Sequence, residues 1–202
     1  MSHIMDIDAV ELLHRYAAGE QNFSQVLLSG ADLAGVSLPL VCLKEAVLEG
    51  TNLSGANLRG VDFTGANLSG ADLSKADLTG ADLTAATLTG ANLCSARLIG
   101  ARFAGAQLIG ADLSWANLTG ATLNQADMKR ADLSYANLSD ALLVGVDLRN
   151  GKLAEANLNR TDLIDANLQD ADLTGIDLQA ANLTGAILSE SSDEDLQIES
   201  WE

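Results

Sequence analysis

The stretch of sequence that decides the fold is Ala66-Asn67-Leu68-Ser69-Gly70-Ala71-Asp72-Leu73. Its two leucines are five residues apart, and this spacing continues in both directions. From Phe23 to Leu188 every fifth residue is large and apolar, through 34 successive positions without insertion or deletion. A period of five fits neither a strand, which repeats every 2 residues, nor a helix, which repeats every 3.6. The chain is therefore predicted to turn a corner every five residues.

Three further phases keep the same register. The residue two places before each large apolar position is alanine in 24 of 33 cases, and the residue directly before it is Asp or Asn in 22 of 34. Sixteen of the 18 glycines lie two places after it, where a corner with positive φ favours glycine. We expect the leucine and alanine to point inward and the others outward. Gly151 occupies an alanine position, which predicts that Gly151→Ala is neutral or stabilising.

These residues resemble the A(D/N)LXX motif of the pentapeptide-repeat family over about 165 of the 202 residues. The resemblance implies an all-β solenoid, a right-handed quadrilateral β-helix with four pentapeptides in each 20-residue coil. Thirty-four repeats then give about 8.5 coils and a rod roughly 41 Å long at the spacing of neighbouring strands. The segment 13–20, LHRYAAGE, is also similar to the leader of cyanobacterial members of the family.

Charged residues in the repeats favour four pentapeptides per coil over three. Three basic residues occupy the position usually taken by Asp or Asn: Arg97, Arg102 and Lys152. Twenty residues from each of them lies at least one aspartate, so a 20-residue coil places every cation beside an acid. A 15-residue coil would leave two of the three without one. The phenylalanines at 23, 63 and 103 are also 40 residues apart, which is two whole coils.

The chain divides into four predicted segments. Residues 1–4 are interpreted as a vector remnant, and residues 5–20 as an N-terminal capping α-helix. The apolar residues Val10, Leu12, Leu13, Tyr16 and Ala17 recur there at helical spacing. Residues 21–189 form the repeats, and residues 190–202 form an acidic C-terminal tail or cap. A cap is needed because the end of a stack of coils exposes unpaired backbone groups.

Composition excludes several classes of function. A net charge of −17 argues against direct binding of nucleic acid, which requires a basic surface. The two histidines lie outside the repeats, and no nucleophile–base set, phosphate loop or zinc spacing is present. We therefore predict no enzyme activity, no cofactor and no metal. The sequence shows no membrane span or secretion signal, and Cys42 and Cys94 are expected to be free thiols, which together indicate a cytoplasmic protein.

The candidate binding site is an aromatic pair. Trp115 and Tyr135 both lie two places after a leucine and are one 20-residue coil apart, so we expect them to stack on the outer surface. Asp112 and Asp132 lie beside them. An exposed aromatic pair with a polar rim is typical of the centre of a protein-binding surface. The alternative is two surface aromatics that only cover the backbone at a wide corner.

Two functions follow from these observations. The first is a protein-interaction scaffold or regulator that presents a rigid acidic face to an unknown protein partner, as a monomer or as a weak end-to-end or face-to-face dimer. The second comes from the resemblance, since some family members inhibit DNA gyrase by imitating duplex DNA. The column Asp32, Asp72, Asp112, Asp132 and Asp172 could supply the required charge.

Overall fold

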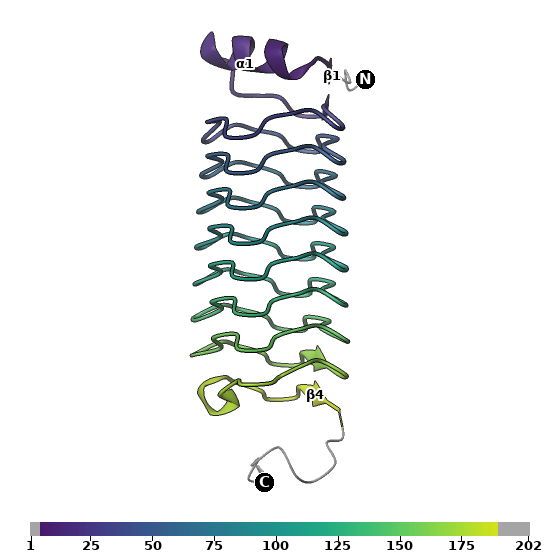
Figure 1. Cartoon of the computed structure of the whole chain (residues 1–202), viewed down its shortest axis with the longest axis vertical. Coiled ribbons are helices and arrows are strands. Elements are labelled where there is room, and N and C mark those ends of the chain that lie inside the picture. The colour runs from purple at the N-terminus through teal and green to yellow at the C-terminus, as the bar shows by residue number, and fades with distance from the viewer. Residues whose placement is uncertain (1–4, 190–202) are drawn as a thin grey trace.

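The computed structural model describes residues 5–189, and its repeats form a single stack of similar coils (Figure 1). Isolated parallel β-bridges join residues 20 apart along the whole stack, from Asn22↔Cys42 to Asp162↔Asn182. The chain therefore returns to the same position after four pentapeptides, which agrees with the predicted 20-residue period. The predicted segments 1–4 and 190–202 lie outside the described residues.

Continuous strands are short because the chain turns a corner every five residues. The strands are β1 (Met5–Asp6), β2 (Val26–Leu27), β3 (Asn167–Leu168) and β4 (Ile187–Leu188). β1 pairs with β2, and β3 pairs with β4, both in parallel. Between them the sheet consists of single bridges. A 3-10 helix, η1 (Leu178–Ala180), replaces the regular corner near the C-terminal end of the stack.

The interior consists of the predicted leucine and alanine positions. In the middle coils these side chains are fully buried, and the phenylalanines at 23, 63 and 103 are buried with them. The two threonines at alanine positions, Thr51 and Thr161, donate their hydroxyls to the backbone oxygens of Leu28 and Leu138, at 2.8 and 2.9 Å. Their polar groups are thus satisfied inside an apolar core.

The hydrogen bonds of the backbone explain the preference for Asp and Asn. In the repeat around Leu68 and Ala71, four of every five N–H groups bond to backbone oxygens, either in a neighbouring coil or within the corner. The remaining N–H belongs to the residue after the leucine. It donates to the side-chain oxygen of the Asp or Asn before the leucine, as Ser69 donates to Asn67 at 3.1 Å. The acidic and amide columns therefore complete the hydrogen bonding of the corners.

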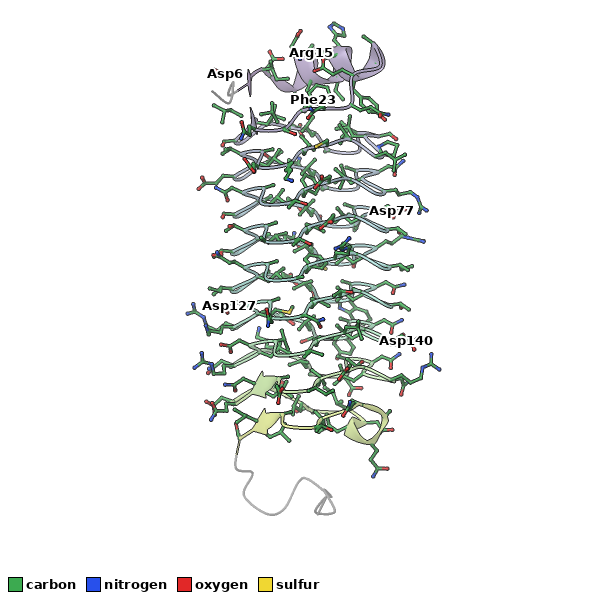
Figure 2. The ribbon with its side chains drawn as sticks, turned by 180° about the vertical axis from the view of Figure 1, so that it is seen from behind. Asp6, Arg15, Phe23, Asp77, Asp127 and Asp140 are labelled. Atoms are coloured by element: carbon green, nitrogen blue, oxygen red, sulfur yellow. The ribbon has the colours of Figure 1, made fainter. Side chains whose placement is uncertain are left out.

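A short helix, α1 (Ala9–Ala17), lies across the N-terminal end of the stack, as predicted (Figure 1). Leu12 is fully buried there, and Figure 2 shows Phe23 just below the helix that carries Arg15. The Arg15 guanidinium carbon lies 5.7 Å from the centre of the Phe23 ring. Helix and first coil thus share one core.

The helix is shorter than the predicted segment 5–20. Asp8 caps its first turn, because the Asp8 side chain accepts a hydrogen bond from the Glu11 N–H at 2.8 Å. Asp6 lies before this cap in β1, which adds a rung above β2. Val10 was expected on the apolar face but is exposed, because Ala9, Leu12, Leu13 and Tyr16 form the face that packs on the coils.

The ion pairs agree with the predicted columns. Arg97 pairs with Asp77, Arg102 with Asp82, and Lys152 with Asp132, at 3.9, 3.6 and 3.2 Å. Each pair joins residues 20 apart. The positive φ expected at the corners is also present, and it extends to 16 residues other than glycine.

Candidate functional site

The candidate site lies along one corner of the stack, in a column formed by the fifth residue of every fourth repeat, one residue from each coil. The column contains Lys75, Ser95, Trp115, Tyr135 and Glu155, with φ between 58° and 61°. The N–H of Trp115 donates to the oxygen of Ser134, and the N–H of Tyr135 donates to the oxygen of Ala154, so that the column advances by one coil at each residue. The backbone ladder therefore fixes the vertical spacing of these side chains.

Trp115 and Tyr135 stack on each other as the sequence predicts. Their ring centroids are 4.3 Å apart and the ring planes differ by 10°. The stack does not bury them, because Trp115 is 61% exposed and Tyr135 is 49% exposed. Two large aromatic rings thus form one projecting surface with a fixed orientation, which is the kind of anchor that dominates many protein interfaces.

The backbone conformation of Trp115 and Tyr135 shows that the fold does not require aromatic residues at these two corners. Both have φ of 61°, in the left-handed region that L-residues with bulky side chains rarely adopt. Glycine occupies the equivalent corner in 16 repeats and satisfies the same backbone geometry without strain. The aromatic side chains therefore cost conformational energy at these corners while remaining mostly exposed to solvent.

The two predicted aspartates differ in their surroundings. The Asp112 side chain accepts a hydrogen bond from the N–H of Ser114 at 2.9 Å, and among the described residues no cation forms an ion pair with it. Asp132 lies next to Asp112 in the parallel ladder and pairs with Lys152 at 3.2 Å. Partial burial raises the pKa of Asp132, but hydrogen bonds from Ser134 and Lys152 outweigh it and hold the pKa below its ordinary value. Asp112 is thus the aspartate whose charge remains available.

Glu155 is a residue of this site that the sequence analysis did not identify. It follows Tyr135 in the same column, one coil further, and its side chain reaches over Gly175. A Cβ atom placed on Gly175 would lie 2.6 Å from the Glu155 carboxyl carbon. Extending the aromatic column by one more 20-residue step would have found it.

Between residues 5 and 189 there is no group of three or more His, Cys, Asp or Glu side chains arranged to hold a metal ion. Over the same range no helix has the length and apolar character needed to cross a membrane.

Comparison with known protein families shows which family this sequence matches. The profile of the family described as pentapeptide repeats matches residues 42–80, 76–114, 111–150 and 141–179, so it covers the greater part of the chain. The chain belongs to the pentapeptide repeat family. A search of curated proteins found no match.

Several solved pentapeptide repeat structures are similar to this chain. HetL from the cyanobacterium Nostoc sp. strain PCC 7120, described as involved in the regulation of heterocyst differentiation, is 34% identical. The alignment covers 92% of this chain and 99% of HetL, with a TM-score of 0.45. Full-length QnrB1, a plasmid-mediated fluoroquinolone resistance protein, is 20% identical over 81% of this chain and 92% of QnrB1, with a TM-score of 0.46. A thylakoid-lumen protein of Arabidopsis thaliana is 29% identical over 56% of this chain and 68% of its own, with a TM-score of 0.33.

Within this pentapeptide repeat protein, the aromatic pair stands apart from the other exposed apolar side chains. Among the large hydrophobic residues of the described range 5–189, Leu40 is the most exposed and also has positive φ, but it folds down over Gly60. Leu142 is exposed at a different position of the repeat. Trp115 and Tyr135 are the only two aromatic rings that stack on each other in the described residues.

Proposed function

We propose that this protein is a non-enzymatic interaction scaffold or regulator, and that Trp115 and Tyr135 form the centre of its protein-binding surface. The observation that carries the proposal is the exposed, parallel stack of two large rings at corners where the backbone favours glycine. Two large aromatic rings that stack on each other and remain exposed are best explained by a contact with another molecule. Asp112 provides the polar rim on one side.

The proposal also depends on the stiffness of the surface. We infer that the stack is a right-handed, four-sided β-helix, as the pentapeptide-repeat family implies, and that it holds the two rings in one orientation. A rigid surface loses little conformational entropy when it binds, which favours affinity without a large interface. Cytoplasmic location and the monomeric or weakly dimeric state remain part of this proposal.

The test replaces both aromatics by the residue that the corner prefers. Trp115→Gly/Tyr135→Gly should fold with at least wild-type stability, since relief of the positive φ offsets the loss of ring stacking. Immobilised protein is used to capture partners from lysate of the source organism, with quantification by mass spectrometry. We expect the double variant to lose a specific partner about tenfold or more relative to wild type, as hot-spot residues do.

The matched control is Leu40→Gly, which removes an exposed apolar side chain from the same repeat position elsewhere on the stack. It should capture the same proteins as wild type. Equal capture by wild type and the aromatic double variant would contradict the proposed site.

A further inference from the structure

We propose that the aromatic pair binds an arginine side chain of a basic protein partner, whose guanidinium stacks on the free face of Tyr135 and pairs with Glu155. This inference rests on the proposed function and names the chemistry of the partner. It is argued from the free face of the ring, the position of Glu155 and the charges of the neighbouring residues.

The ring stack leaves one face of Tyr135 open. Trp115 covers the other face, at a centroid distance of 4.3 Å with nearly parallel planes. Because Trp115 and Tyr135 lie in successive coils, the uncovered face of Tyr135 looks toward the next coil, which carries Glu155. Coils are spaced by about 4.8 Å. A planar group about 3.5 Å thick can therefore lie against the ring if the Glu155 side chain leaves this layer free.

The Glu155 carboxyl group is directed away from this layer. It lies over Gly175, one coil beyond the backbone of Glu155, and Gly175 has no side chain that would push it back. Among residues 5–189 no ion pair and no side-chain hydrogen bond involves the Glu155 carboxylate. A cation on this face of Tyr135 would therefore contact an aromatic ring and lie close to an unpaired carboxylate.

The cations of the protein itself do not fill this position. Lys152, in the same coil as Glu155, is directed to Asp132 at 3.2 Å. Lys75 lies in the same column but three coils from Tyr135, beyond Ser95 on the far side of Trp115. The chain carries a net charge of −17, so a basic partner is attracted over long range as well as at the contact.

The geometry favours arginine over lysine. The guanidinium is planar, so it can lie flat on a tyrosine ring and still direct its N–H groups sideways to a carboxylate. The lysine ammonium is a compact and strongly hydrated charge, and it gains less from a flat aromatic surface. A preference for arginine at equal charge is thus the signature of this site.

Another glutamate in the stack, Glu45, serves as a control for the carboxylate of Glu155. Glu45 occupies the same repeat position as Glu155, has φ of 56° and also lies over a glycine, Gly65. The residue before Glu45 in its column is Gln25, whose amide donates to the Glu45 carboxylate at 2.6 Å. Glu45 is therefore a glutamate at the same repeat position that has no aromatic ring before it and whose carboxylate is already hydrogen-bonded.

The experiment measures the preference directly. Trp201→Phe leaves Trp115 as the only tryptophan, so its fluorescence reports on the ring stack. The Trp201→Phe protein is titrated at low ionic strength with hexa-arginine and with hexa-lysine peptides. The dissociation constants for the two peptides are obtained from the fluorescence of Trp115 and checked by calorimetry. We expect hexa-arginine to bind about fivefold more tightly than hexa-lysine, from the stacking and the ion pair together. Tyr135→Gly should bring this ratio close to one, and Glu155→Gln should lower it while weakening the binding of both peptides, whereas Glu45→Gln should leave it unchanged.

Equal affinity for the two peptides would overturn the inference, and so would a preference for arginine that is unchanged in Tyr135→Gly or that falls as much with Glu45→Gln as with Glu155→Gln. Failure of this inference differs from failure of the proposed function. If partner capture requires the aromatic pair but the peptides show no preference for arginine, the surface binds a protein through other chemistry. If capture does not depend on the pair, the proposed function itself is wrong.

Discussion

The five residues of each repeat have different physical roles, and each role restricts the residue type. The leucine fills the interior, and the alanine leaves room for it. The Asp or Asn accepts a hydrogen bond from the N–H two residues later, as Asp62 does from Thr64 at 2.9 Å. The fifth residue turns the corner with positive φ. A substitution therefore has an effect that depends first on its position in the repeat.

Gly151 is a residue for which the structure reverses the sequence prediction. A Cβ atom at Gly151 would lie 2.9 Å from the backbone oxygen of Leu148, closer than van der Waals contact allows. We therefore expect Gly151→Ala to destabilise the protein by about 1 kcal/mol, through overpacking against a carbonyl that is held by hydrogen bonds. Equilibrium unfolding in denaturant would measure the change.

Ala131→Gly is the matched control for Gly151→Ala, because Ala131 lies one coil earlier in the same inner column and is fully buried. It should also destabilise, since it removes a buried methyl group. An increase in stability for Gly151→Ala would show that this corner contains a cavity after all.

At the scale of the elements, ion pairs connect neighbouring coils on the outer surface. Arg160 pairs with Asp140 across one coil, at 2.6 Å. Lys129 contacts both Asp127 and Asp147, at 2.9 and 3.2 Å, and Arg149 contacts Asp147 at 2.8 Å. Figure 2 shows Asp127 and Asp140 on opposite sides of the stack, so these pairs are not confined to one face.

Asp147 should make stability depend on pH. Hydrogen bonds from the Arg149 guanidinium, then from the Arg149 N–H and from Lys129, lower its pKa from 3.8 to about 2, against the opposing effect of partial burial. A lowered pKa in the folded state stabilises the fold above the unfolded pKa, and this contribution is lost as pH falls from about 4 to about 2. Asp147→Asn should lower the thermal midpoint by about 2–4 °C at pH 7 and by much less at pH 2.

The control for this pH dependence is Asp62→Asn. Asp62 has the same place in its repeat but forms no ion pair within the described residues. Its substitution should change the midpoint little, and by a similar amount at both pH values. A pH-independent effect of Asp147→Asn would rule out the ion pairs as its cause.

At the scale of the whole molecule, the charge is distributed too thinly for a close copy of DNA. Residues 21–189 contain 18 acids and ten bases, a net charge of −8. Seven of the ten bases form ion pairs with aspartates, namely Arg59, Arg97, Arg102, Lys129, Arg149, Lys152 and Arg160. Over roughly 41 Å this is one net charge per about 5 Å, compared with one per about 1.7 Å in duplex DNA.

We therefore expect no inhibition of DNA gyrase when this protein is added at stoichiometric amounts to a supercoiling assay, with a known gyrase inhibitor as the positive control. Inhibition near equimolar amounts would instead favour DNA mimicry and direct attention to the Asp32–Asp172 column. In that case Asp72→Asn/Asp112→Asn should weaken the inhibition, because both changes keep the corner hydrogen bonds while removing charge.

Much of the candidate site could be predicted because the repeat has no insertions. With a 20-residue coil, Trp115 must lie beside Tyr135, and Lys152 beside Asp132, and both contacts are present. Asp112 and Asp132 were both predicted beside the aromatic pair, and the ion pair of Asp132 with Lys152 leaves Asp112 as the one of the two without a cation. The reach of Glu155 over Gly175 was not predictable, because it depends on side-chain rotamers and on the space left by the next coil.

The sequence by itself determined the period, the inward and outward positions and the neighbours along each column. These follow from a strict spacing of five and from the need to bury leucine and to pair every backbone group. Only the tertiary structure decided where α1 begins, which face of α1 packs on Phe23, how closely Leu148 approaches Gly151 and which carboxylates remain unpaired. Those features depend on differences of a few tenths of an ångström in the distances between packed atoms. The pattern of residue types along the chain does not specify such distances.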